Sequence, residues 1–114
     1  MTIHYLEIVT NDVDGTIAMY EAAQGLEFGA PTAALGNART AAFPTGETIG
    51  IRSPMHDAES PVVRPYYLTE ALLETIDKVE QLGAEIALPP MAIDSHGIIA
   101  IYIIDGLHYG LWQL

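Results

Sequence analysis

Residues 3–25 read IHYLEIVTNDVDGTIAMYEAAQG, and residues 62–83 read VVRPYYLTEALLETIDKVEQLG. The second stretch repeats the residue pattern of the first. Four positions return 59 positions later, as the pairs Thr10 and Thr69, Val13 and Leu72, Ile17 and Ile76, and Tyr20 and Val79. A short chain that repeats one unit of strands and helix is expected to pack the two copies about a pseudo-twofold axis, and a cleft between copies is a natural ligand site.

The first copy has the pattern of a strand followed by a helix. Residues 3–9 are rich in β-branched and aromatic side chains, which is typical of a strand. Asn11 or Asp12 supplies a helix N-cap, and Gly25 follows the helical stripe where a left-handed C-cap is favoured. Three short strands are predicted next, at residues 26–28, 39–43 and 47–52.

The second copy predicts the same order of elements. A strand at residues 62–68 leads to a helix capped by Thr69 and ended by Gly83. Asp105-Gly106 forms the turn of the last hairpin. The three strands after the helix are predicted at residues 85–88, 98–104 and 109–113.

One α+β domain over residues 1–114 is therefore predicted. It contains two βαβββ modules, at about residues 1–53 and 62–114, and their sheets form a curved pair that encloses a cleft. Residues 53–61, rich in Pro, Asp, Glu and Ser, are predicted to form the linker between the modules.

Composition restricts the partners of this chain. Fifteen acidic residues against four basic ones give a net charge of -11, which repels nucleic acid and anionic lipid. The longest apolar run, residues 98–104, is too short to span a bilayer, and the first residues lack the pattern of a signal peptide. We expect a cytoplasmic protein that binds a small molecule, with no nucleic-acid or membrane partner.

The order and doubling of these elements resemble the vicinal oxygen chelate superfamily, which includes glyoxalases, bleomycin-resistance proteins and extradiol dioxygenases. The resemblance is carried by EIVTNDV at residues 7–13, MY at 19–20, LGA at 82–84, and DG at 105–106 before GLWQ at 110–113. It covers essentially the whole chain. It implies two sheets curved around a shared cleft, and a homodimer.

The resemblance also implies where a metal would be held. In that superfamily a divalent metal is bound by His or Glu from the first strand of each module and a carboxylate from the last. Matched position by position, these ligands fall on Tyr5, Arg64, Gly50 and Gly110. None is a histidine or a carboxylate, and an arginine repels a cation. We therefore predict no metal and no other cofactor.

A shift of one residue would bring His4 to the first of these positions. Side chains alternate along a strand, so His4 shares a face with Leu6 and Ile8. We therefore expect His4 on the other side of the sheet, under the helix or at its rim. A metal site with shifted ligands, at His4, Glu7 and His108, stays open as an alternative.

Side chains near the four matched positions give the candidate site. Glu7 and Arg64 are the candidate catalytic residues, with Glu7 as general base and Arg64 stabilising an oxyanion. A structural ion pair between the two is the alternative. Gly50 and Gly110 are expected to leave volume on this face. The candidate ligand-binding residues are Tyr5, Arg52, Tyr66, His96, Tyr102, His108 and Trp112.

Three functions fit these observations. The preferred one is a small-molecule-binding protein or a metal-independent lyase- or isomerase-like enzyme, and the sequence leaves open whether the chain is an enzyme. The second is sequestration of an antibiotic, as in bleomycin-resistance proteins, because the acidic balance suits a cationic aromatic drug. The third is a metal-dependent glyoxalase or dioxygenase with shifted ligands.

Overall fold

The computed structural model describes residues 2–114, and these form two compact units. One unit contains residues 5–63. The other contains residues 2–4 together with residues 64–114. Within the described chain each βαβββ module supplies one α-helix and four strands. The predicted α+β class with two βαβββ modules is confirmed.

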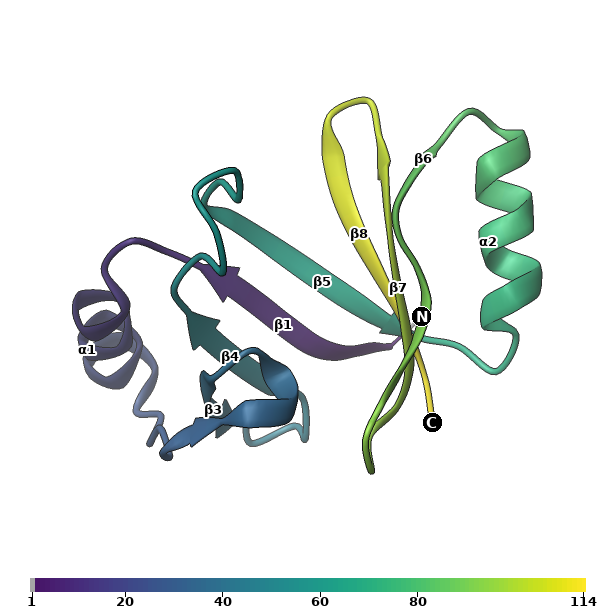
Figure 1. Cartoon of the computed structure of the whole chain (residues 1–114). Coiled ribbons are helices and arrows are strands. Elements are labelled where there is room, and N and C mark those ends of the chain that lie inside the picture. Colours follow the sequence, from purple (N-terminus) through teal and green to yellow (C-terminus); the bar gives the residue numbers. More distant parts are fainter. Residues whose placement is uncertain (1) are drawn as a thin grey trace. The chain divides into compact units, whose positions relative to one another are not determined.

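The first module runs from β1 to β4. Its elements are β1 (Ile3–Val9), α1 (Val13–Gln24), β2 (Pro31–Thr32), a 3-10 turn (Ala33–Leu35), β3 (Ala38–Ala42) and β4 (Thr48–Arg52) (Figure 1). The strands lie in the order β2-β3-β4-β1. β1 runs parallel to β4, and the other neighbours are antiparallel.

Helix α1 begins and ends where the sequence predicts. The side chain of Asp12 accepts a hydrogen bond from the Gly15 amide at 3.0 Å, which satisfies a first-turn donor. Gly25 ends the helix with a φ of 68°, a left-handed conformation that costs glycine little. The predicted caps of this helix are therefore confirmed.

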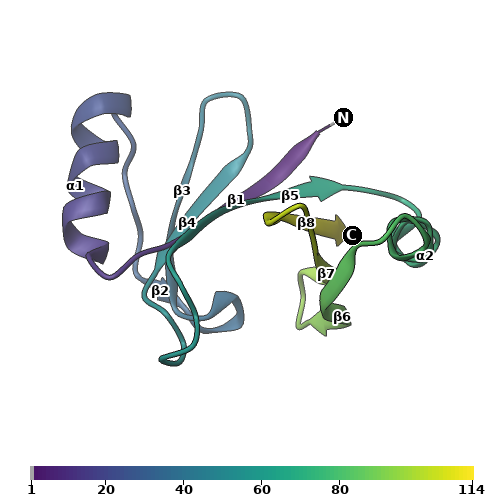
Figure 2. The same cartoon turned by 90° about the horizontal axis from the view of Figure 1, so that it is seen from above.

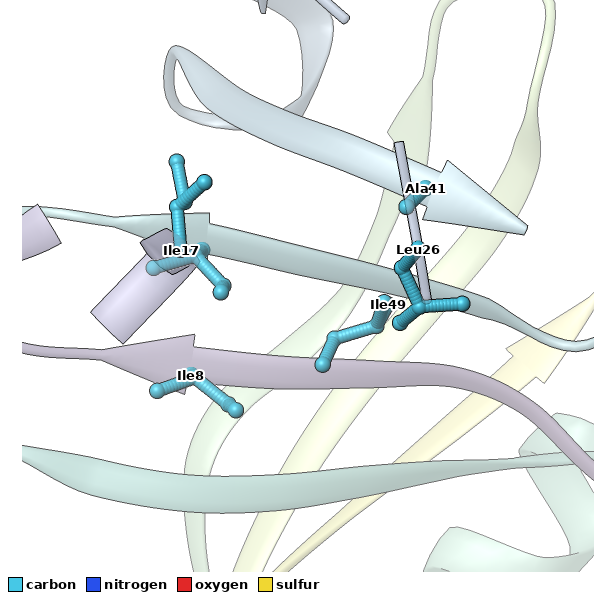
Figure 3. Close-up of a cluster of buried hydrophobic side chains, with 6 residues drawn as sticks. Ile8, Ile17, Leu26, Ala41 and Ile49 are labelled. Atoms are coloured by element: carbon cyan, nitrogen blue, oxygen red, sulfur yellow. The ribbon is translucent and has the colours of Figure 1, made fainter. Parts of the chain in front are cut away.

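The core of the first module lies between α1 and its strands. Figure 3 shows Ile17 of α1 grouped with Ile8 of β1 and Ile49 of β4. Ile49 is fully buried, which stabilises the fold by about 1.5–3 kcal/mol relative to an exposed side chain. The buried members of this cluster are Ile8, Ile17, Leu26, Ala41, Ile49 and Ile51.

The strand predicted at residues 26–28 is wrong. The structure describes this segment in full and places it outside any strand. Leu26 is buried in the core, and the backbone is attached to β3 near Gly29, whose amide donates to the Thr40 carbonyl at 2.9 Å. An apolar side chain that anchors a loop therefore gave this segment the composition of a strand.

The second module runs from β5 to β8. Its elements are β5 (Val62–Leu68), α2 (Leu72–Gln81), β6 (Glu85–Ile93), β7 (Gly97–Ile104) and β8 (Leu107–Gln113). The strands lie in the order β5-β8-β7-β6, with β5 parallel to β8 and the other neighbours antiparallel. Figure 2 looks along the axis of α2, which packs against β6, β7 and β8.

The start of α2 differs from the prediction. Thr69 is not its N-cap; that position belongs to Ala71, whose methyl group cannot accept a hydrogen bond. The first helical amide, that of Leu72, donates instead to the side chain of Gln113 at 2.9 Å. A residue 41 positions away therefore does what a local cap would do.

Strand β6 is longer than predicted. It continues through Pro89 and Pro90 to Ile93, and its pairing with β7 shifts register on both sides of Leu88. Because β6 pairs with β7 and ends its unit's strand order, its prolines interrupt the ladder only where the register is already irregular. The hairpin turn is confirmed, since Asp105 and Gly106 both have positive φ.

The repeat is confirmed at the level of strand register. Each module contains one parallel strand pair, and the two pairs match position by position. In the first module Glu7 lies opposite Gly50, and in the second Tyr66 lies opposite Gly110. Two positions further on, Val9 lies opposite Arg52 in the first module, and Leu68 lies opposite Trp112 in the second. Within residues 2–114, no helix is long and apolar enough to cross a membrane.

Candidate functional site

Both glycines that were expected to leave volume lie under aromatic rings. A Cβ at position 50 would collide with the hydroxyl and ring of Tyr5, and one at position 110 with the ring of Tyr66. Tyr5 and Tyr66 are only 4% and 3% exposed. The expectation of free volume is therefore wrong, because a neighbouring strand supplies a large side chain at each position.

A buried ion-pair network joins β1, β4 and the linker in the first unit. The Nε of Arg52 donates to Oε2 of Glu7 at 2.9 Å, and its two Nη atoms each donate to one oxygen of Glu59 at 2.8 Å. Oε1 of Glu59 also accepts the Met55 amide at 2.7 Å. Arg52 is 4% exposed and Glu7 is 7% exposed. We call Glu7, Arg52 and Glu59 the charged triad.

The charged triad sets the ionisation of its neighbours. The hydrogen bonds to Glu59, with the nearby charge of Glu7, raise the pKa of Arg52 against the opposing effect of burial, so the guanidinium stays charged. Burial raises the pKa of Tyr5, and the charge of Glu7 raises it further. Tyr5 is therefore a neutral phenol.

In the second unit Arg64 contacts His108 across neighbouring strands. Tyr66 lies opposite Gly110, and the same register two residues earlier brings Arg64 to His108. The Nη2 of Arg64 lies 3.5 Å from Nδ1 of His108. A guanidinium can only donate, and this distance is at the outer limit of a hydrogen bond. Arg64 is 6% exposed.

Two aromatic rings, those of Tyr66 and Trp112, lie on the same face of the sheet as this pair, because they follow Arg64 and His108 at even spacing along β5 and β8. The Trp112 ring is edge-on to Tyr66, with ring centroids 5.7 Å apart, and edge-on to His4 at 5.0 Å. Its Nε1 donates to the His96 carbonyl at 2.8 Å, so His96 meets this group through its backbone. We call Arg64, Tyr66, His108 and Trp112 the arginine–aromatic face.

The place of His4 differs from the expected one. The sequence put it under the helix or at its rim, but it packs against Trp112. The reason is that residues 2–4 belong to the second unit, where the Leu68 amide donates to the Thr2 carbonyl at 2.8 Å. Strand alternation gave the face of residues 6 and 8 correctly but did not reveal this pairing.

Tyr102 does not join the arginine–aromatic face. Its ring stacks on Tyr109 with centroids 5.3 Å apart, and it packs against the cluster under α2 that contains Leu111. Because neighbours along a strand face opposite sides, Leu111 and Trp112 lie on different faces of the sheet. Burial raises the pKa of Tyr102. The grouping of Tyr102 with Tyr66 and Trp112 is therefore not supported.

The residues at the metal positions do not fit a cation. Tyr5 is a neutral phenol, Arg64 is a guanidinium, and the two glycines are covered by rings. Among residues 2–114 no group of three His, Cys, Asp or Glu side chains is placed to hold a metal ion. In the shifted set, Glu7 is bonded to Arg52 and His108 contacts Arg64, so each has a guanidinium at its side.

The sequence did not predict the contacts of two residues, Glu59 in the charged triad and His4 beside Trp112. In the sequence Glu59 is one acid of the linker, and no local signal distinguishes it from the surface acids. The sequence offers His4 only as a metal ligand or as a structural residue. The contact of His4 with Trp112 joins residues far apart in the chain, and Glu59 meets Arg52 from a linker with no regular period, so a local pattern encodes neither contact.

Comparison with known proteins bears on the fold. No protein-family profile matches the sequence, and no characterised protein matches it in sequence. Among solved structures, a methylmalonyl-CoA epimerase from Mycobacterium tuberculosis shares 14% identity at a TM-score of 0.71, over 97% of this chain and 86% of that one. A hypothetical protein from Bacillus halodurans C-125 shares 12% identity at a TM-score of 0.72, over 99% and 94%.

A third similar structure is a methylmalonyl-CoA epimerase from Streptomyces coelicolor in complex with 2-nitronate-propionyl-CoA. It shares 15% identity at a TM-score of 0.66, over 99% of this chain and 94% of that one. Identities this low establish the fold alone. The chain has the vicinal oxygen chelate fold that its sequence resemblance implied.

Proposed function

We propose that this chain, which has the vicinal oxygen chelate fold, is a small-molecule-binding protein that works without the metal of that superfamily. The arginine–aromatic face carries the proposal. Burying a guanidinium costs free energy, so a buried arginine on a face that also carries two aromatic rings is more than a solubility feature. Its planar fork suits the paired oxygens of a carboxylate or an enolate, and His108 lies beside it.

The charge of the chain narrows the class of ligand. The chain contains only four basic residues, and its net charge is -11. Arg39 donates to the carbonyls of Gly29 and Phe28, and Arg52 is bonded to its two glutamates. Few cations are therefore left for the phosphates of a coenzyme A ester. We propose a small acid or carbonyl compound that lacks phosphates.

An isomerase-like activity is the second candidate, and the orientation of Glu7 favours it. A carboxylate held by Arg52 in a buried setting is placed as a general base is placed in enzymes that remove a proton next to a carbonyl group. Two of the similar structures are epimerases. In this candidate function Glu7 takes the proton, and Tyr5 is a neutral donor beside it.

The binding function is tested with Arg64→Gln. We expect wild-type protein to bind one of a panel of small carboxylic and 2-oxo acids, methylmalonate included, more tightly than methylmalonyl-CoA. Loss of charge-assisted hydrogen bonds worth about 1.5–3 kcal/mol weakens binding in the variant by about tenfold or more. Isothermal titration calorimetry measures both, with circular dichroism to verify folding.

Arg39→Gln is the matched control, because it also removes one strand arginine but leaves the arginine–aromatic face intact. Its affinity should equal that of the wild type. Equal affinity of Arg64→Gln and the wild type would contradict the proposal. Binding of bleomycin in place of every acid would support sequestration instead.

The isomerase function is tested by proton exchange. We expect the α-proton signal of methylmalonate to disappear in D2O with wild-type protein, and about a hundredfold more slowly with Glu7→Gln, because a positioned base contributes at least that factor. Proton NMR follows the exchange. Binding without any exchange in the wild type would leave a binding protein and remove the enzyme.

A further inference from the structure

The charged triad contains more charge than a structural ion pair needs. Arg52 bonds Glu7 through Nε and grips both oxygens of Glu59 through its Nη atoms, so one guanidinium serves two carboxylates. Side-chain exposures are 4% for Arg52 and 9% for Glu7. A single carboxylate would have neutralised the arginine at a lower cost of desolvation.

The repeat supplies an internal comparison within the same chain. The register that places Glu7 opposite Gly50 and Arg52 opposite Val9 places Tyr66 and Trp112 at the equivalent positions of the second module. There the two rings pack edge-on at 5.7 Å. Two uncharged aromatic side chains therefore satisfy the same positions of the same fold, and the fold does not require a glutamate–arginine pair.

The geometry of Glu59 indicates what the extra carboxylate does. Its bidentate grip fixes the plane of the guanidinium, because two parallel hydrogen bonds leave the fork little freedom to turn. Its Oε1 is itself fixed by the Met55 amide at 2.7 Å. With the fork held in this way, Nε points at Oε2 of Glu7.

We propose that Arg52 and Glu59 are positioning residues for Glu7. Glu59, from the linker, orients the guanidinium of Arg52, and Arg52 orients the carboxylate that meets the ligand. This assigns Arg52 to holding Glu7 and not to gripping a ligand. The inference rests on the proposed isomerase function for its effect on rate, but its effect on Glu7 is measurable without any activity.

The test is Glu59→Gln with Asp57→Asn as matched control, since Asp57 is an exposed acid of the same linker. Carbon-13 NMR of the Glu7 carboxyl and nitrogen-15 NMR of Arg52 Nε are recorded at one fixed neutral pH. We expect both resonances to change in Glu59→Gln and to stay unchanged in Asp57→Asn. Where exchange activity is present, kcat falls about tenfold with KM within about twofold.

An unchanged Glu7 resonance in Glu59→Gln would overturn the proposal. A lowered Tm in the same variant would then show that Glu59 only holds the linker in place. If Glu59→Gln does not fold, Glu59→Asp takes its place, because it keeps the charge and must still move the fork. A Glu7 resonance that changes in protein without exchange activity would sink the proposed isomerase function and keep the positioning role.

Discussion

Tyr5 and Tyr66 cover the two glycines from different positions of their strands. Tyr66 lies directly opposite Gly110, whereas Tyr5 lies opposite Thr48 and reaches Gly50 diagonally. The two modules therefore fill equivalent spaces with residues that are not equivalent in the repeat. The diagonal reach leaves the position opposite Gly50 to Glu7, and this places a carboxylate in the first module where the second has a ring.

Substitution of Gly110 tests how closely the ring of Tyr66 packs. A Cβ at this position would overlap the ring, so Gly110→Ala should destabilise the fold by about 1–3 kcal/mol. Urea denaturation measures the free energy of unfolding. Gly29→Ala is the control, because its Cβ would meet only the Thr40 carbonyl oxygen at 3.9 Å. Equal stability of the two variants would contradict this packing.

The phenol of Tyr5 makes the stability of the fold decrease with pH in the alkaline range. Burial raises its pKa in the folded state above the value of about 10 in the unfolded chain. Above pH 10 the folded state keeps a proton that the unfolded state has lost. The contribution of the neutral Tyr5 phenol to the free energy of unfolding is therefore fully present below pH 10 and is lost as the pH rises above it. Tyr5→Phe should lose less Tm than the wild type between about pH 10 and 11 in a thermal scan. Identical slopes would refute the assignment.

At the scale of elements, the two helices begin in different ways. Asp12 caps α1 locally, whereas the first amide of α2 is satisfied by Gln113. Asp12→Ala should therefore cost about 1 kcal/mol of stability by denaturant titration, while Asp57→Ala in the exposed linker should change it little. A loss below a few tenths of a kcal/mol in Asp12→Ala would show that the cap is not needed.

Local patterns predicted the elements that local interactions determine. Alternation and turn chemistry gave β1, β5 and the β7–β8 hairpin, where Asp105-Gly106 adopts the required positive φ. They failed at residues 26–28, whose apolar side chain anchors a loop, and at β6, where Pro89-Pro90 marked an end that the strand passes through. In both places contacts with other parts of the fold, and not composition, decide the outcome.

The candidate site was only partly predictable for the same reason. Strand parity brought Arg64, Tyr66, His108 and Trp112 to one face, because β5 and β8 have regular register. It could not identify Glu59 as the partner of Arg52, since a linker residue has no register to count from. It also could not separate the ligand-gripping role of an arginine from the positioning role that its partners indicate.

At the scale of the whole molecule, one duplicated sequence has diverged in chemistry. The first module carries the charged triad and the second carries the arginine–aromatic face, on strand pairs of equivalent register. Neither retains the histidine and carboxylate pattern that holds a cation in the superfamily it resembles. The homodimer implied by that resemblance stays a prediction, which sedimentation velocity would test.

Ligand binding without a divalent cation is the central claim, and calorimetric titration tests it most directly. Chelator-treated protein is titrated in turn with Mg²⁺, Mn²⁺, Co²⁺ and Zn²⁺. The side chains at the four metal positions predict only weak binding, unchanged in Glu7→Gln and His108→Ala. One cation held tightly per chain, and released by either substitution, would contradict the claim.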